Sequence, residues 1–318
     1  MFFRRLRLTI LIITFLSIPV FCSVLIPPDE WYVAGILSLT IPAFTLLIAG
    51  ALIYFILTRS RWAILPAGIL CAALPLFSTS FSFIPADHQF AAPLHLVTHN
   101  MNALKFYVKR AEFDSNKQAF QTWIAKNDFD IICLQEMVEG KQVPFLIPGY
   151  HKASSSKHTK LGDHLGLFIF SRYPIIRSGK MEFAFNSYNR LMWVDVATGK
   201  DTLRVINVHL MSYDFTSYSV RGNLRKIRAA IRARTWHVKL IHRFVQRSPY
   251  PVILCGDFNE TPVSYPYRKI TSLLTDAFAG SGAGFQYSFR FLGLPIRIDQ
   301  ILISPSLRAR DYKVTHDV

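Results

Sequence analysis

Negative charge and cysteine are both scarce in this 318-residue chain. It has 20 Asp and Glu residues against 36 Lys and Arg, which gives a formal net charge of +16 at pH 7. No close-spaced Cys or His pattern is present, which excludes the usual zinc and disulfide signatures. We expect the four cysteines to be small buried apolar residues, namely Cys22, Cys71, Cys133 and Cys255. The positive charge favours anionic partners such as phosphate esters, nucleic acid or acidic lipid head groups, although a basic surface is also common in membrane-associated proteins without a specific partner.

Charge of either sign is absent from three long stretches, residues 8–26, 31–58 and 62–86. Each is long enough to cross about 30 Å of hydrocarbon as a helix, which takes about 20 residues. The prolines in these stretches are tolerated in lipid-embedded helix bundles. The sequence therefore predicts a membrane anchor of three transmembrane helices within residues 1–86. The alternative for the first stretch is a cleaved signal peptide, although no small-x-small cleavage site stands out near Ser23.

Basic residues flank these stretches asymmetrically. Three arginines within residues 4–7 precede the first stretch, and Arg59 and Arg61 follow the second, so both flanks are expected on the cytoplasmic side. The third span then runs outward, which places residues 87–318 in the periplasm or outside the cell. The predicted location is therefore a multi-pass protein of the cytoplasmic membrane with an external catalytic domain.

From residue 88 onward, short β-branched or aromatic runs alternate with helix-like segments, without an internal repeat or a second change of composition. This pattern predicts one α/β domain over residues 87–318. The expected strands cover residues 94–98, 129–134, 166–170, 191–196, 202–208, 252–255 and 298–304, and the expected helices cover residues 115–127 and 221–246.

Polar residues lie at the ends of five of these strands. The clearest example is the run Gly-Asp257-Phe-Asn259, directly after the apolar residues 251–255. Open α/β sheets usually place their chemistry at strand ends, and five such coincidences in one order are hard to explain by packing. The other four segments are Thr98-His99-Asn100, Leu134-Gln135-Glu136, Asn207-Val208-His209-Leu210 and Arg297-Ile298-Asp299-Gln300-Ile301.

Together with residues 166–174, which end in Ser-Arg-Tyr-Pro, these segments resemble the endonuclease/exonuclease/phosphatase (DNase-I-like) superfamily across residues 94–318. Each motif is weak alone, but their order and spacing are specific. The resemblance, to a membrane-anchored bacterial type, implies a four-layer α/β sandwich in which two β-sheets face each other and the site lies at one end. The predicted fold is this sandwich preceded by three transmembrane helices.

The resemblance also implies a role for each motif residue. Glu136 would be the principal ligand of Mg²⁺, with Mn²⁺ as the alternative ion, and Asn100 would lie beside it. Asp257 would orient or deprotonate the attacking water, while His209 would donate to the phosphate. Asn259 would hold the Asp257 carboxylate or a phosphate oxygen. The alternatives are turn formation for the two asparagines and a half-buried structural role for His209.

Asp299 would normally pair with a late histidine, which fixes the tautomer of that histidine. Family members typically close with Ser-Asp-His followed by an apolar strand. The only histidine after Asp299 is His316, where Thr315 replaces the expected Asp. Either the given sequence stops before the motif, so that residues 87–318 lack their last strand and general acid/base, or His316 is a displaced equivalent. We favour the first explanation.

Residues 221–247 contain nine Lys or Arg and no acid, with apolar residues at helical spacing on one side. This segment is either an outer helix with a solvated basic face or an electrostatic attachment to anionic lipid or extracellular DNA. For Arg190 we expect a salt-bridged surface arginine, with a contact to the phosphate as the alternative, and for His95 and His99 we expect structural roles.

The sequence thus predicts a membrane-tethered, metal-dependent phosphoesterase that hydrolyses phosphodiester or phosphomonoester bonds of nucleic acid or of lipid and inositol phosphates. The expected partners are a phosphate-ester substrate and the lipid bilayer, with nucleic acid as a further candidate and no protein partner. The alternative is a catalytically impaired binding or scaffold module of the same fold.

Overall fold

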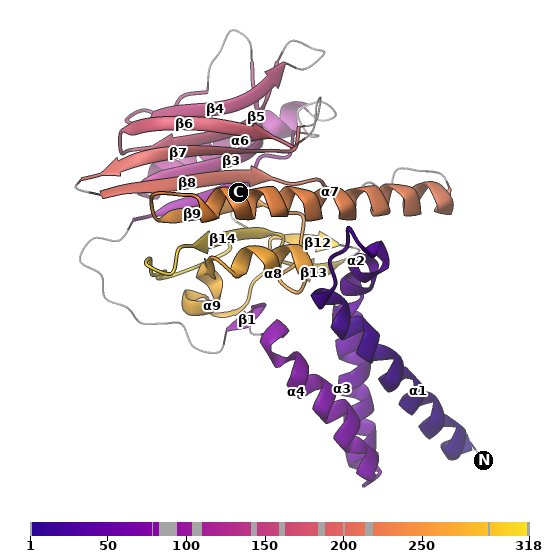
Figure 1. The fold of residues 1–318 in the computed structure, drawn as a ribbon. Helices are drawn as coiled ribbons and strands as arrows, with labels where there is room; N and C mark the ends of the chain where they lie inside the picture. Colours follow the sequence, from indigo (N-terminus) through magenta and orange to yellow (C-terminus); the bar gives the residue numbers. More distant parts are fainter. Residues whose placement is uncertain are drawn as a thin grey trace.

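Helices form the N-terminal part of the chain and two β-sheets form most of the rest (Figure 1). The computed structural model describes residues 2–77, 79–82, 94–103, 110–140, 145–158, 163–183, 188–199, 201–213, 219–291 and 293–316. The N-terminal elements are α1 (Phe2–Cys22), η1 (Ser23–Leu25), α2 (Tyr32–Leu39), α3 (Ile41–Leu57), η2 (Arg61–Ala63) and α4 (Ile64–Phe77).

The prediction of three transmembrane helices is wrong for the part of the chain that the structure describes. One helix, Phe3–Leu25, is long and apolar enough to cross a membrane, and a signal sequence near an N-terminus has the same character. α2 and α3 qualify only as a pair, because they are bent by 55° at a break. Thr40 ends α2, and Pro42 lies in the first turn of α3. A proline is favourable there, because the backbone N–H that it lacks would have no partner within the helix. These two residues explain the break.

The third expected span is too short in the described residues. α4 has 14 residues, which rise only about 21 Å at 1.5 Å per residue. Residues 83–86, the end of that expected span, lie outside the described part of the chain. The multi-pass topology and the external placement of residues 87–318 are not tested by the fold.

The cysteine prediction is correct for two residues and wrong for two. Cys133 and Cys255 are buried, whereas Cys22 and Cys71 are exposed on α1 and α4. These helices also expose large apolar side chains such as Leu16. Burial therefore cannot be inferred from an apolar run when the whole helix carries apolar side chains around its circumference.

Two sheets face each other in the remainder of the chain. The first has four strands in the order β2 (Leu96–Asn100), β3 (Ile131–Glu139), β5 (His164–Ser171) and β4 (His151–His158). The second has six, in the order β10 (Thr275–Asp276), β14 (Asp299–Ile303), β9 (Val252–Asp257), β8 (Asp201–His209), β7 (Arg190–Thr198) and β6 (Ile175–Glu182). One apolar cluster, with members such as Cys133, Ile169, Val205 and Cys255, fills the space between the sheets.

Helices cover both outer faces. α6 (Arg110–Lys126) packs on the first sheet through Phe120 and Ile124. α7 (Val220–Gln246) and α8 (Tyr265–Thr271) pack on the second sheet through residues such as Val238 and Ile270. The layers are therefore helix, sheet, sheet and helix, as predicted for the α/β sandwich. The nine strands and helices expected from the sequence are present, and the two sheets and their covering helices also contain β4, β6, β10 and α8, which were not expected.

The N-terminal helices pack directly against the sandwich. α2 approaches α7 so closely that a Cβ on Gly35 would lie 2.6 Å from Cγ2 of Ile231. Val263, just before α8, shares an apolar cluster with Val20 and Val24. β1 (Phe81–Ser82) pairs with β11 (Gly284–Phe285), close to α9 (Ala277–Ser281) and to the hairpin of β12 (Phe289–Phe291) and β13 (Leu294–Ile296). The division at residue 86 thus stays a prediction based on composition.

Candidate functional site

Four of the predicted site residues meet at one end of the sandwich, where β2, β3, β8 and β9 all end. Nδ2 of Asn100 donates to Oε1 of Glu136 at 3.1 Å and to Oδ2 of Asp257 at 2.9 Å. Nε2 of His209 lies 3.4 Å from Oε1 of Glu136 and 4.0 Å from Oδ2 of Asp257. They converge because β2 runs parallel to β3 and β8 runs parallel to β9, so that each pair ends at a common edge.

A β-bulge aims the Glu136 side chain at this cluster. The register of β3 against β5 shifts between Leu134 and Met137, and Glu136 itself has a φ of +48°. Such bulges re-aim side chains next to active sites. Oε2 of Glu136 accepts a hydrogen bond from the backbone N–H of Ala103 at 3.1 Å, which fixes the carboxylate on the side of the first sheet.

A glycine allows Asp257 to lie beside His209. Gly256 has a φ of +131°, and a Cβ at this position would be 2.1 Å from the carbonyl oxygen of Val208 on β8. Only glycine permits this close approach of two backbones. As a result Asp257 and His209 are directly opposite each other in the parallel pair of β8 and β9.

Asn259 holds the turn after Asp257 in two ways. Its backbone N–H donates to Oδ1 of Asp257 at 2.8 Å, and its side-chain Nδ2 donates to the carbonyl oxygen of Leu210 at 3.0 Å. Its φ of +50° is the left-handed conformation that asparagine tolerates. The Asp257 carboxylate is therefore held by the backbone of Asn259, while the side chain binds the segment that follows His209.

Asp257 and Asp299 face each other across the antiparallel pair of β9 and β14. Burial raises the pKa of Asp257, and Glu136 adds to this, while His209 and the Asn100 hydrogen bond oppose it. Burial raises the pKa of Asp299 well above its usual range, and the charge of Asp257 raises it further. Oδ1 of Asp299 is buried and has no hydrogen-bond partner among the residues that the structure describes.

His316 does not join this cluster. Its side chain is exposed, and its ring stacks at 4.5 Å on the ring of Tyr287. No hydrogen bond or ion pair joins His316 to Asp299 in the described part of the chain. The described arrangement therefore does not show the pairing that a displaced His316 would make with Asp299, which was the less favoured of the two explanations.

Comparison with known proteins agrees with the fold. The model of the endonuclease/exonuclease/phosphatase family matches residues 97–318. The chain belongs to this family. A second family model, described as a domain of unknown function, matches residues 2–80.

Individual relatives have low sequence identity to this chain. An inositol phosphosphingolipids phospholipase C from Schizosaccharomyces pombe is 28% identical over 202 residues, which are 59% of this chain and 46% of that protein. The chain thus spans less than half the length of this relative. The catalytic domain of human Nocturnin with bound sulfate is 16% identical and has a TM-score of 0.51, covering 72% of this chain and 87% of that one. An endonuclease/exonuclease/phosphatase family protein from Bacteroides thetaiotaomicron is 18% identical with a TM-score of 0.49, covering 74% and 87%.

A buried polar pair, Gln135 and Asn207, lies beneath the candidate site. Both residues belong to the sequence motifs, but no role was predicted for either of them. Nδ2 of Asn207 on β8 donates to the carbonyl oxygens of Leu134 and Phe168 in the opposite sheet, at 2.9 and 3.1 Å. Its Oδ1 accepts a hydrogen bond from Nε2 of Gln135 at 2.7 Å. The signal was present, because Asn207 lies two residues before His209 and so points to the same face of the strand. The hydrogen bonds of this pair connect the two sheets below the candidate site.

Arg190 is buried, so the prediction of a surface position for this arginine is wrong. It lies opposite His209 in the antiparallel pair of β7 and β8, and its Nη1 donates to the carbonyl oxygen of Ser155 at 3.1 Å. Burial lowers the pKa of Arg190, and Glu182 and Tyr188 oppose this. The guanidinium thus joins the two sheets close to the site instead of facing solvent.

A second buried arginine lies behind the loops that carry the site. Arg234 of α7 is fully buried and donates from Nε to Oε1 of Glu260 at 2.6 Å and from Nη1 to the carbonyl oxygen of Met211 at 2.5 Å. Its guanidinium also lies 3.8 Å from the ring centre of Tyr213. Because Glu260 follows Asn259 and Met211 follows Leu210, Arg234 links the two segments that Asn259 also joins.

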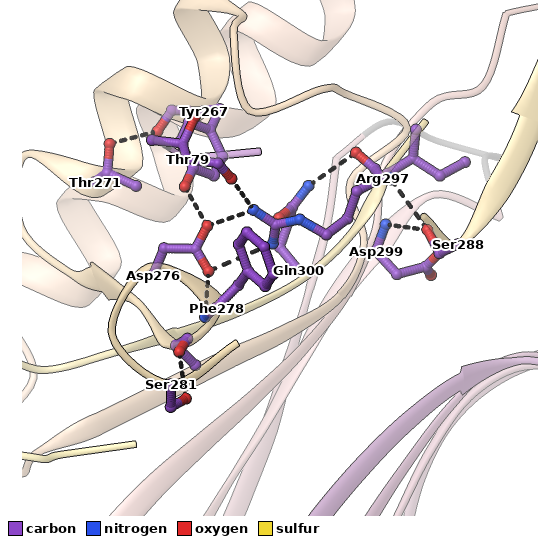
Figure 2. Close-up of polar contacts among 12 residues, drawn as sticks. Thr79, Tyr267, Thr271, Asp276, Phe278, Ser281, Ser288, Arg297, Asp299 and Gln300 are labelled. Atoms are coloured by element: carbon purple, nitrogen blue, oxygen red, sulfur yellow. Dashed lines mark hydrogen bonds and ion pairs between the residues drawn. The ribbon is translucent and has the colours of Figure 1, made fainter. Parts of the chain in front are cut away.

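Arg297 ties the strand of Asp299 to the N-terminal part of the chain (Figure 2). Its Nη2 donates to Oδ2 of Asp276 and to the carbonyl oxygen of Thr79, both at 2.6 Å, and its Nη1 donates to Gln300. The Asp276 carboxylate also accepts a hydrogen bond from the hydroxyl of Tyr267. The two structural histidines behave as expected: His99 stacks on Phe120 at 4.9 Å, and exposed His95 contacts the backbone of Asp128.

The donor set fits a hard divalent cation. The described residues contain no group of three or more His, Cys, Asp or Glu side chains arranged to hold a metal. Mg²⁺, however, is usually bound by only one or two carboxylates together with waters. Here Glu136 and Asp257 share one amide donor from Asn100, and buried Oδ1 of Asp299 is unsatisfied in the described structure. This excess of buried acceptor oxygens matches the ligand preference of Mg²⁺ or Mn²⁺.

Proposed function

We propose that this chain is a membrane-tethered, metal-dependent phosphodiesterase. The observation that carries the proposal is the convergence of Asn100, Glu136, His209 and Asp257 at the shared edge of the two sheets. Two carboxylates, an amide and an imidazole within hydrogen-bonding distance supply the groups that phosphoester hydrolysis requires. Membership of the family supports the reaction class.

Each residue then has a role. A Mg²⁺ or Mn²⁺ ion held by Glu136 with Asn100 beside it would neutralise charge on the phosphoryl oxygens. Asp257 orients the attacking water and accepts its proton, and its raised pKa makes it a stronger base than an ordinary aspartate. His209 donates from Nε2 to a phosphate oxygen. Asn259 keeps Asp257 in position through its backbone N–H.

Two observations favour a lipid-linked phosphodiester as the substrate. The curated relative from Schizosaccharomyces pombe is named as a phospholipase C acting on inositol phosphosphingolipids. The apolar helix α1 and the bent pair of α2 and α3 pack directly against the sandwich, which would hold the site close to a bilayer. Nucleic acid is the alternative substrate.

A catalytically impaired module of the same fold is the second candidate. It is favoured by the unsatisfied Oδ1 of Asp299 in the described structure and by the position of His316 on Tyr287. A general acid or base contributes about 10²- to 10⁴-fold to rate, so the lack of this pair would weaken activity severely. Metal binding at Glu136 would remain.

The test is hydrolysis of bis(p-nitrophenyl) phosphate by the full-length protein in detergent, with Mg²⁺, with Mn²⁺ and with EDTA. We expect metal-dependent activity that falls by about 10²-fold or more in Glu136→Gln, which keeps the shape of the side chain and removes its charge. Lys180→Gln, an exposed change on β6, is the matched control. A folded protein without metal-dependent activity would support the impaired module. Competition by phosphosphingolipid and by an oligonucleotide then separates the two substrate classes, and His316→Ala shows whether His316 is needed.

A further inference from the structure

One face of α7 carries a continuous row of basic side chains. Their spacing of three or four residues keeps them on one side of a helix with 3.6 residues per turn. All but Lys239 are exposed, and the segment contains no acid. The basic residues of this stripe are Arg221, Arg225, Arg228, Arg232, Lys239 and Arg243, and Trp236 occupies the position between Arg232 and Lys239. We call these seven residues the basic stripe.

The N-terminal helices contact α7 on this same side. The guanidinium of Arg228 lies 4.6 Å from the ring centre of Tyr32, at the start of α2. Lys239 forms an ion pair with Asp29, in the link between η1 and α2. α1 and α3 run away from this contact, and the first half of α7 extends beyond the strands on the side of α2 (Figure 1). The stripe and the apolar helices therefore belong to one side of the molecule.

The level of the stripe corresponds to the point where the apolar helices would leave a bilayer. α1 ends at Cys22, and the polar link that follows contains Asp29, which touches the stripe. Trp31 in this link is 44% exposed, and Trp236 within the stripe is 49% exposed. Tryptophan is enriched at membrane interfaces, and Lys and Arg there interact with anionic head groups.

The stripe is poorly explained as an ordinary solvated face. Arg221, Arg225 and Arg232 have no carboxylate partner among the described residues. The apolar side chains of Leu224 and Trp236 are both about half exposed beside them. Arginine alternating with exposed apolar groups on a helix is typical of a surface that lies in a lipid interface.

We propose that the basic stripe of α7 binds the anionic head groups of the bilayer in which the N-terminal helices are inserted. This inference rests on the membrane tether of the proposed function. Because Arg234 on the same helix is hydrogen-bonded to Glu260 and Met211, the stripe sets the height and orientation of the catalytic loops above the lipid. Each basic residue should strengthen the attachment of α7 about five-fold, which corresponds to about 1 kcal/mol near an anionic surface.

The experiment uses the full-length chain in vesicles of phosphatidylcholine alone or of phosphatidylcholine with phosphatidylglycerol. The readout is quenching of Trp236 fluorescence by a lipid spin-labelled on its head group, obtained as the difference from the same protein with Trp236→Phe. We expect quenching several-fold stronger in the anionic vesicles and weakened by high salt. The triple change Arg221→Gln, Arg225→Gln and Arg232→Gln should abolish that difference, since about 100-fold in attachment is lost.

The matched control neutralises three exposed basic residues elsewhere, Arg177, Lys180 and Arg308, each to Gln, and should keep the quenching. Equal quenching in both kinds of vesicle, from protein that resists alkaline extraction, would overturn the role of the stripe and leave the tether standing. Protein that alkaline carbonate removes from the vesicles would refute the tether itself. A further outcome would assign the stripe to nucleic acid and overturn the inference. In it, a short oligonucleotide protects Trp236 from quenching on phosphatidylcholine vesicles, while phosphatidylglycerol does not change the quenching.

Discussion

Replacing Arg234 by Met should destabilise the protein more than any other single change of a basic residue on α7. Arg234 is fully buried and Glu260 is 6% exposed, with Nε and Oε1 2.6 Å apart. Removing one partner of a buried ion pair leaves an uncompensated charge and costs about 3–5 kcal/mol. This range includes the loss of the hydrogen bond from Arg234 to the carbonyl oxygen of Met211.

This loss can be measured as a shift in the thermal unfolding midpoint of the full-length protein in detergent. A change of 1 kcal/mol shifts the midpoint by about 2–4 °C in a domain of 150–250 residues, so we expect a decrease of about 6–20 °C. Arg232→Met is the matched control, because it makes the same chemical change two residues away on the exposed face. Exposed substitutions of this kind usually stay within about 0.5 kcal/mol.

The double variant Arg234→Met with Glu260→Gln tests the cause. If the stranded Glu260 carboxylate is the main penalty, removing its charge should restore at least half of the lost stability. The reasoning is refuted if Arg234→Met behaves like Arg232→Met, or if the double variant is no more stable than the single one.

Three further changes probe the site. Gly256→Ala places a Cβ 2.1 Å from the carbonyl oxygen of Val208, so it should displace Asp257 and lower kcat sharply while KM changes little, and unchanged kcat would contradict this. Asp299→Asn should remove one contribution to the pH dependence of stability in EDTA. The raised pKa of Asp299 means that the folded state keeps a proton that the unfolded state loses above about pH 3.9, so the stability contributed by this group falls as pH rises from there through the raised pKa. A difference in unfolding midpoint between wild type and variant that does not fall over that range would refute this. Asn207→Ala removes the side-chain donor shared by two buried carbonyl oxygens and should cost about 1–3 kcal/mol in urea unfolding, whereas a neutral effect would show that the amide contributes no net stability.

The cluster of candidate site residues was predictable because local patterns determine it. Alternating or continuous apolar residues fix each strand, and the motif residues follow directly at the ends of those strands. Parallel neighbours must then bring Asn100 close to Glu136 and His209 close to Asp257. No knowledge of distant contacts is needed for this step, apart from the pairing of strands that the family resemblance supplied.

The buried arginines were not predictable in the same way. Arg234 was one of nine basic residues in a segment that looked uniformly solvated, and only Glu260 and Met211, which lie 26 and 23 residues away, distinguish it. Arg190 donates from Nη1 to a backbone carbonyl of the other sheet, a contact that no sequence pattern predicts. A charge can be buried only where its partners converge, and that convergence is a property of the tertiary structure.

The division between anchor and catalytic domain near residue 86 stays a prediction from composition. Composition changes near residue 86, but hydrogen bonds connect the two sides of that boundary. The carbonyl oxygen of Thr79 accepts a hydrogen bond from Arg297, and β1 pairs with β11. A domain cut near residue 87 would leave the buried guanidinium of Arg297 without one acceptor, two residues from Asp299. The N-terminal segment is therefore part of the support of the site.

The charge distribution at the site leads to a final prediction about metal. Glu136 and Asp257 share a single amide donor, and burial together with their mutual charge opposes ionisation of Asp257 and Asp299. The protein's own donors thus offset the ionised forms of these carboxylates only in part. A divalent cation bound only by the folded state should raise stability by about 2.7 kcal/mol at 100 times its Kd, or about 5–10 °C in midpoint. In Glu136→Gln this gain should shrink while stability in EDTA rises. If Mg²⁺ stabilises the variant and the wild type equally, the ion binds elsewhere, and Glu136 is not its ligand.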